Sequence, residues 1–152
     1  MSIHKAADCI NGKFCKLFAT IDGNVEEIAI AKTFEATVEK TKEEIRVMGD
    51  LWTQHKATGL SGSGTMTLYY CSPLFRKMMV GFEKTKKDSY FTMTVISNDQ
   101  GSNAGTQTVI LNDVNINSTV AAKGDVDAIL DEEIPFTFSG WSFPSHFNDS
   151  LV

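Results

Sequence analysis

The fold class is decided by the stretch Leu60-Ser-Gly-Ser-Gly-Thr-Met-Thr-Leu-Tyr-Tyr-Cys71. In its second half, apolar side chains such as Met66 and Leu68 alternate with threonines. An apolar–polar period of two is typical of a β-strand with one buried face. Gly62 and Gly64 in the first half predict either a weaker strand end or the close approach of another backbone.

Six further segments have the composition of strands, and together they predict an antiparallel β fold. Between the first two, Asp22-Gly23-Asn24 supplies the positive-φ positions that a tight hairpin turn requires. The fifth segment should contain a bulge near Asn112-Asp113, because its apolar phase slips there. The segments are 14–21, 25–31, 33–39, 90–97, 106–120 and 134–138.

One segment, Ser72 to Lys86, changes to the helical period. Ser72 suits the N-cap and Pro73 the first helical position. We expect its apolar stripe to pack against the core and not to form a binding groove. The stripe includes Phe75, Met78, Met79 and Phe82. The sequence therefore predicts an antiparallel β-sandwich or barrel with one α-helix packed on its outside, in a single domain spanning residues 1–152.

Composition and charge exclude several classes of protein. The 152 residues carry a net charge of -5, which argues against a protein that grips nucleic-acid phosphates through a basic face. The chain has neither a signal-peptide core nor an apolar run of transmembrane length, so we expect synthesis in the cytoplasm and no membrane insertion. Cys9, Cys15 and Cys71 are odd in number and predict reduced, partly buried thiols.

Residues that could perform catalysis or bind a metal are scattered. His4, His55 and His146 lie in three different regions, and none has metal-ligand spacing to a cysteine or another histidine. The acidic segment 125–133 lacks the residue order of a calcium loop, so a solvated acidic face is expected. We therefore predict that the protein is not an enzyme and binds no cofactor or metal.

The segment from Glu43 to Gly59 interrupts the strand pattern and predicts a long mid-chain loop. Loops of this length are uncommon in small domains and are usually functional. Trp52 lies within it among polar residues. Two interpretations remain open: Trp52 anchors a protein interface, or the loop folds back and buries it.

Seven short segments carry a family resemblance. They are Ala19-Thr-Ile-Asp-Gly23, Glu35-Ala-Thr-Val-Glu-Lys40, Trp52-Thr-Gln-His-Lys56, Gly62-Ser-Gly-Thr-Met-Thr-Leu-Tyr-Tyr70, Leu74-Phe-Arg-Lys-Met-Met79, Asp113-Val-Asn-Ile116 and Glu133-Ile-Pro-Phe-Thr-Phe138. In this order they resemble the tail tube (core tail) proteins of contractile phage tails, in the branch of PBSX-like defective prophages and of R-type bacteriocins (tailocins) such as diffocins. The resemblance covers residues 12–147, and the segments beginning at Trp52 and Gly62 are its most specific part.

The resemblance implies a phage tail tube-like fold whose subunits close into hexameric rings that stack into a hollow tube. Sheets of six subunits would join into one barrel around the channel, with the helix outside. The Glu43–Gly59 segment would reach the adjacent ring, with Trp52 as stacking anchor and His55 and Lys56 as polar partners. Implied partners are further copies, the tail sheath protein, a baseplate or tube initiator and the tape measure protein, with DNA only as passive cargo. The implied location is a virion tail or bacteriocin particle released by lysis.

Other functions are compatible with the same residues. A monomeric β-sandwich module that binds a small ligand or carbohydrate is one alternative, because such folds host many functions. The inner tube protein of a type VI secretion system is another. The family resemblance also implies an acidic channel that keeps DNA from sticking, but the sequence does not decide whether Glu35, Thr37 and Glu39 face the channel or the sheath.

Overall fold

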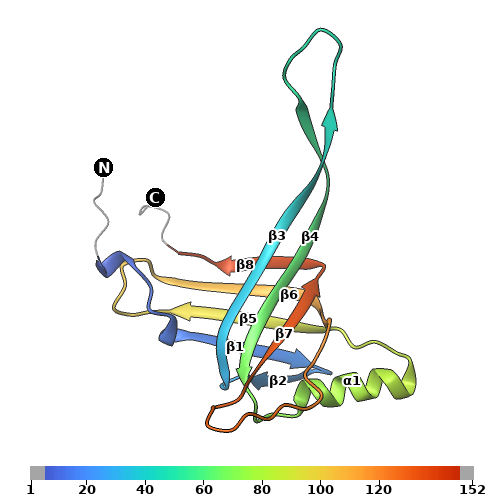
Figure 1. Cartoon of the computed structure of the whole chain (residues 1–152). Helices are drawn as coiled ribbons and strands as arrows, with labels where there is room; N and C mark the ends of the chain where they lie inside the picture. The colour runs from blue at the N-terminus through green and yellow to red at the C-terminus, as the bar shows by residue number, and fades with distance from the viewer. Residues whose placement is uncertain (1–5, 148–152) are drawn as a thin grey trace.

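Two antiparallel sheets that share one strand form the body of the protein (Figure 1). The computed structural model describes residues 6–147. Short 3-10 turns at Ala6–Asp8 and Gly12–Phe14 precede the first strand. The elements that follow are β1 (Cys15–Ile21), β2 (Asn24–Glu27), β3 (Ala31–Ile45), β4 (Gln54–Tyr69), α1 (Leu74–Thr85), β5 (Phe91–Asn98), β6 (Thr106–Ile116), β7 (Asp131–Phe138) and β8 (Gly140–Ser145).

Strand β6 belongs to both sheets. The strands run in the order β2-β1-β5-β6-β7-β4-β3, and β8 also pairs with β6. The first part of β6 pairs with β8 up to Asn112, whereas Asn115 and Ile116 pair with β7. Asp113 lies between these two parts with a φ of 53°, at a shift in the register with β5. The predicted bulge is therefore confirmed, and it bends β6 from one sheet into the other. The strand ends at Ile116, earlier than predicted.

The core lies between the inner faces of the two sheets. Period-two alternation fixes these faces: along β7, buried and more exposed positions alternate from Glu132 to Phe138. The alternation predicted at Met66 and Leu68 is confirmed, because both side chains are buried. Other buried members of the core are Leu17, Ala19, Phe75, Phe91, Met93, Leu111, Val114, Ile134 and Phe136.

Gly62 and Gly64 allow the close packing at the centre of the second sheet. A Cβ atom at residue 62 would lie 2.5 Å from the Phe138 ring. At residue 64 it would collide with the carbonyl oxygen of Glu35 and the Phe136 ring. The close approach expected from the sequence is thus confirmed, with β3 backbone and β7 aromatic rings as the neighbours.

The first hairpin confirms the expected turn at Asp22 and Gly23, which have φ values of 52° and 81°. The chain after this turn differs from expectation. Strand β2 is only four residues long, and β3, at fifteen residues, extends well beyond the predicted end at residue 39.

The predicted helix is confirmed with slightly different ends. It begins at Leu74, so the N-cap residue is Pro73 and not Ser72, and the predicted start is wrong by one residue. The Ser72 hydroxyl still accepts a hydrogen bond of 3.4 Å from the Leu74 N–H. Lys86 closes the helix in a left-handed conformation with a φ of 61°. Phe75 in the first turn is buried and lies 6.2 Å from the Phe91 ring. Among residues 6–147, no helix is long and apolar enough to cross a membrane.

Candidate assembly surfaces

A long two-stranded ribbon projects from the body (Figure 1). Strand β4 pairs with β7 only from Gly62 to Tyr69, but its pairing with β3 continues outward to Ile45 and Gln54. Residues 39–45 of β3 therefore extend about 23 Å beyond the sheets at ~3.3 Å per residue. The prediction of a loop over Glu43–Gly59 is wrong, because only residues 46–53 connect the strands.

The tip of the ribbon is apolar and exposed. Met48 and Leu51 are fully exposed, and Trp52 is 82% exposed. The Trp52 N–H donates a 3.0 Å hydrogen bond to Asp50 Oδ1, which shapes the turn without covering the indole. Of the two interpretations of Trp52, burial against its own chain is wrong. An exposed Trp at a loop tip is the kind of side chain that anchors protein interfaces.

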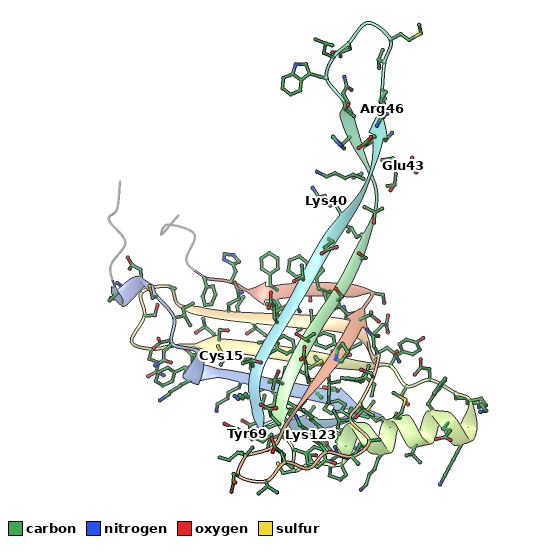
Figure 2. The ribbon with its side chains drawn as sticks, viewed as in Figure 1. Cys15, Lys40, Glu43, Arg46, Tyr69 and Lys123 are labelled. Carbon is green, nitrogen blue, oxygen red and sulfur yellow. The ribbon has the colours of Figure 1, made fainter. Side chains whose placement is uncertain are left out.

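The polar residues predicted near Trp52 lie on the stem of the ribbon and not in its loop. His55 and Lys56 belong to β4, and His55 Nε2 is 4.0 Å from Glu44 Oε1. Arg46 donates a 2.9 Å hydrogen bond to Glu44 Oε2. Figure 2 shows Lys40, Glu43 and Arg46 on this projecting part of the ribbon. The structure therefore brings the charges together below an apolar tip.

The second sheet presents open backbone edges. Within residues 6–147, β3 pairs with β4 alone, so its other edge is free over its whole length. Strand β7 has β4 on one side, and on its other side β6 pairs with Phe136 and Thr137. The Asn117 N–H, directly after β6, donates a 2.8 Å hydrogen bond to the Pro135 carbonyl oxygen, so residues 131–134 have no partner strand on that side among the described residues. Unpaired edges are templates for strands of another chain, and an isolated two-stranded ribbon is marginally stable in water. Both features favour a partner of the same kind.

The outer face of the second sheet is polar and acidic. Glu35, Thr37 and Glu39 lie opposite Thr65, Ser63 and Ser61 in the ladder between β3 and β4. A shallow hollow of about 370 Å³ lies over this face, and no lysine or arginine lines it among the described residues.

The helical stripe divides between the core and the surface. Phe75 is buried and Met78 borders the core, as expected. However, Met78 and Met79, together with Phe82, line a groove of about 300 Å³ between α1 and the end of β6. Phe82 is 42% exposed. The expectation that the whole stripe is core is therefore wrong, because the helix packs on the sheets mainly through its first turns.

The acidic segment 125–133 is not simply a solvated face. The Glu132 side chain is 1% exposed and accepts a 2.6 Å hydrogen bond from Arg76. Asp131 accepts a 3.3 Å hydrogen bond from Lys32 and also interacts with Lys123. The hydrogen bond from Lys32 lowers the pKa of the Asp131 carboxyl below its ordinary value. Desolvation opposes this effect, and the hydrogen bond from Lys123 adds to it.

Other predicted side chains remain dispersed. The part of the chain that the structure describes contains no cluster of three or more His, Cys, Asp or Glu that could hold a metal ion. The expectation of partly buried thiols is wrong, because the three cysteines are free and exposed. His146 Nδ1 lies 2.9 Å from the Phe147 carbonyl oxygen, and His4 lies outside the described residues.

The sequence analysis missed a strand near the C-terminus that carries two aromatic side chains. Trp141 and Phe143 lie on β8 and stack with their ring centroids 5.2 Å apart. Both are about half exposed. Their alternate positions, with Ser142 between them, were the available signal for a strand.

Comparisons with known proteins show which family this chain resembles. The family described as "Phage tail tube protein" matches residues 2–145. "Phage-like element PBSX protein XkdM" of Bacillus subtilis (strain 168) is 44% identical over 148 residues, covering 97% of this chain and 98% of that protein.

Two solved structures share the fold at low sequence identity. A chain in the tube-terminating cap of the anti-feeding prophage superposes with a TM-score of 0.70 at 6% identity, covering 95% of both chains. A chain in the extended sheath–tube complex of an extracellular contractile injection system, PVC, gives 0.64 at 12% identity, covering 86% of this chain and 88% of that chain. The likeness to these structures concerns the fold, whereas the family match and the relative from Bacillus span nearly the whole chain. The protein described here belongs to the phage tail tube protein family, a family of structural tube components and not of enzymes.

Proposed function

We propose that this chain is the repeating subunit of the inner tube of a contractile phage tail or R-type bacteriocin, with six copies in each ring and rings stacked around a channel. The observation that carries the proposal is the β3–β4 ribbon, which reaches about 23 Å beyond the sheets. It ends in the exposed side chains Met48, Leu51 and Trp52. The tip of this ribbon is uncovered in the single chain, and another subunit would bury it.

Ring closure is proposed to use the edges of the second sheet. The free edge of β3 in one subunit would pair with the incompletely paired edge of β7 in its neighbour. Repeated around the ring, this contact joins six small sheets into one barrel and removes every open edge. A heterologous contact of this kind closes into a ring when its rotation closes.

The acidic face of the second sheet is proposed to line the channel. Glu35 and Glu39 lie on this face, and Glu133 is opposite Thr67 in the same sheet. Carboxylates without cations beside them repel the DNA backbone, so DNA would pass as cargo without adhering. Helix α1 would then lie on the outside of the barrel.

The sheath–tube complex of the injection system suggests that the outer surface meets a sheath protein. A baseplate or tube initiator and a tape measure protein are the further partners proposed from the family. The particle would be a virion tail or a bacteriocin, assembled in the bacterial cytoplasm and released by lysis. The PBSX relative favours such a phage-derived tube over a type VI secretion tube or a ligand-binding module.

Size-exclusion chromatography combined with negative-stain electron microscopy of the purified protein tests the proposal. Rings or hollow tubes that grow with protein concentration are the expected result. A protein that stays monomeric at all concentrations and salt conditions, and also when tail baseplates are added as nuclei, would contradict it.

A further inference from the structure

The ribbon tip requires an apolar receptor, and the groove beside α1 offers one. Met78, Met79 and Phe82 form one wall, and Ile116 at the end of β6 lies opposite. Methionines adapt their shape to a partner, and the sulfur contacts aromatic rings favourably. An indole and an aliphatic side chain at the ribbon tip match this surface in chemical character.

The other hollows fit an apolar tip less well. The hollow on the acidic face has Glu35 and Glu39 in its lining. Another hollow, of about 560 Å³, has apolar residues in its lining but also four charged ones, which are Lys13, Lys16, Glu27 and Lys32. An apolar side chain buried there would remove water from these charged groups and would offer them no hydrogen-bond or ionic partner in its place. Among the described residues that line the groove at α1, Asp88 is the one charged residue.

The position of the groove suits a stacked assembly. Figure 1 shows the ribbon tip and α1 at opposite ends of the molecule. A tip therefore cannot reach the groove of its own chain. A contact between two different surfaces at opposite ends is heterologous, and repetition along an axis that does not close gives an open stack.

The charges around the two surfaces also complement each other. On the ribbon, Glu43 lies opposite Lys56 and Glu44 accepts a hydrogen bond from Arg46. The tip loop itself, residues 47–53, holds Asp50 as its one charged residue, which gives -1. Residues 83–88, at the end of α1 beside the groove, hold three lysines against two acids, which gives 3 - 2 = +1. Opposite charges around an apolar contact steer association and fix its orientation.

We infer that the apolar tip formed by Met48, Leu51 and Trp52 seats in the groove of a second copy of this chain in the next ring, between its α1 and the end of its β6. This inference rests on the proposed tube. It adds the receptor: Met79 and Phe82 contact the incoming tip, and the three lysines at the end of α1 face Asp50 of its loop.

Thiol cross-linking between rings tests the contact. The exposed native cysteines are first replaced by serine, giving the background C9S/C15S/C71S. Leu51→Cys is then combined with Met79→Cys, and assembled tubes are treated with a short bis-maleimide. The control combines Leu51→Cys with Lys16→Cys, which lines the hollow of about 560 Å³. Because tip and groove lie at opposite ends of a chain, a cross-link must join two chains.

The expected result is a ladder of covalent oligomers on a denaturing gel for the Leu51–Met79 pair, with little for the Leu51–Lys16 pair. Tubes that form normally but give no Leu51–Met79 ladder would overturn the receptor and leave the tube itself intact. Wild-type protein that never forms tubes would overturn both proposals. These two failures are distinguished by microscopy of the same samples.

A substitution in the groove gives an independent measurement. Phe82→Asp should raise the soluble concentration left after tubes are sedimented by about tenfold or more, as expected for loss of an aromatic interface anchor. Circular dichroism should show an unchanged fold, because Phe82 is 42% exposed. Val126→Asp, at an exposed apolar residue outside the groove, should leave that concentration unchanged. Equal soluble concentrations for Phe82→Asp and wild type would contradict the inference.

Discussion

Arg76 and Glu132 form a buried ion pair that joins α1 to β7. Arg76 Nη1 donates a 2.6 Å hydrogen bond to Glu132 Oε2, and Nη2 donates one of 2.8 Å to the Ser72 carbonyl oxygen. The guanidinium also lies 4.5 Å from the centroid of the Tyr70 ring. The helix, which forms one wall of the groove, is held in place by this pair and by Phe75.

Replacing Arg76 with Met should lower the free energy of unfolding by about 3–5 kcal/mol, because it leaves the Glu132 charge buried without a partner. Urea denaturation of the monomer measures this change. Lys32→Met is the control, since the Lys32–Asp131 pair is partly exposed and such pairs contribute at most about 1 kcal/mol. Equal losses for the two variants would contradict the structural role of Glu132.

Gly64→Ala should destabilise the protein by about 1–3 kcal/mol, the usual cost of overpacking. The added methyl group would collide with the Glu35 carbonyl oxygen and the Phe136 ring. Gly59→Ala is a matched control in the same strand, because nothing lies within 4 Å of its added Cβ. Thermal unfolding should show a lower midpoint for the first variant and little change for the second. The same shift in both would mean that the close packing at Gly64 is absent.

The stability of the folded chain should fall in acid, partly because the Asp131 carboxylate becomes protonated. Its pKa is lower in the folded chain than in the unfolded chain, mainly because of the hydrogen bond from Lys32. The stabilisation is therefore present above about pH 4, the ordinary value of an aspartate, and is lost as the pH falls through the folded value. Asp131→Asn should weaken the pH dependence of the unfolding midpoint below about pH 4. An unchanged profile would show that these ion pairs do not couple folding to protonation.

Trp52→Ala should abolish long tubes without unfolding the subunit. The indole is 82% exposed, so its removal should change the unfolding free energy by less than about 0.5 kcal/mol. Trp52→Phe keeps an aromatic anchor and should retain part of the assembly. Electron microscopy and denaturation of the same preparations separate the two effects. Long tubes formed by the Ala variant at wild-type concentrations would remove the anchor role.

The acidic face can be located by its accessibility in tubes. In the C9S/C15S/C71S background, Glu39→Cys should react with a bulky maleimide in the free subunit but be protected once tubes form. Lys77→Cys, on an exposed position of α1, should react in both states. Protection of Lys77→Cys and free reaction of Glu39→Cys would place the acidic face toward the sheath.

The body of the fold could be predicted from the sequence wherever a strand has one buried face. Burial of one face requires apolar residues at every second position, as at Met66 and Leu68. The shift of this alternation near Asp113 likewise marked the bulge in β6. The ribbon could not be predicted in this way. Residues 39–45 and 54–61 are in solvent on both faces, so no alternation is required, and Gly59 and Trp52 then suggested a loop.

The burial of Glu132 could not be predicted for a related reason. Glu132 looks like its acidic neighbours, but it lies on the inner side of β7 and meets Arg76 from a distant segment. Only the packing of the helix on the sheet brings the two together. The groove was not predicted, because an apolar stripe on a helix usually indicates a face that packs against the core. In the structure α1 packs on the sheets through Phe75 and leaves Phe82 partly exposed.

A cryo-electron microscopy reconstruction of tubes assembled from the wild-type protein is the decisive measurement. We expect sixfold rings in which β3 pairs with a neighbouring subunit and each ribbon tip is buried in the next ring. Tubes whose ribbons end in solvent, or a protein that forms no ring under any condition, would contradict this expectation.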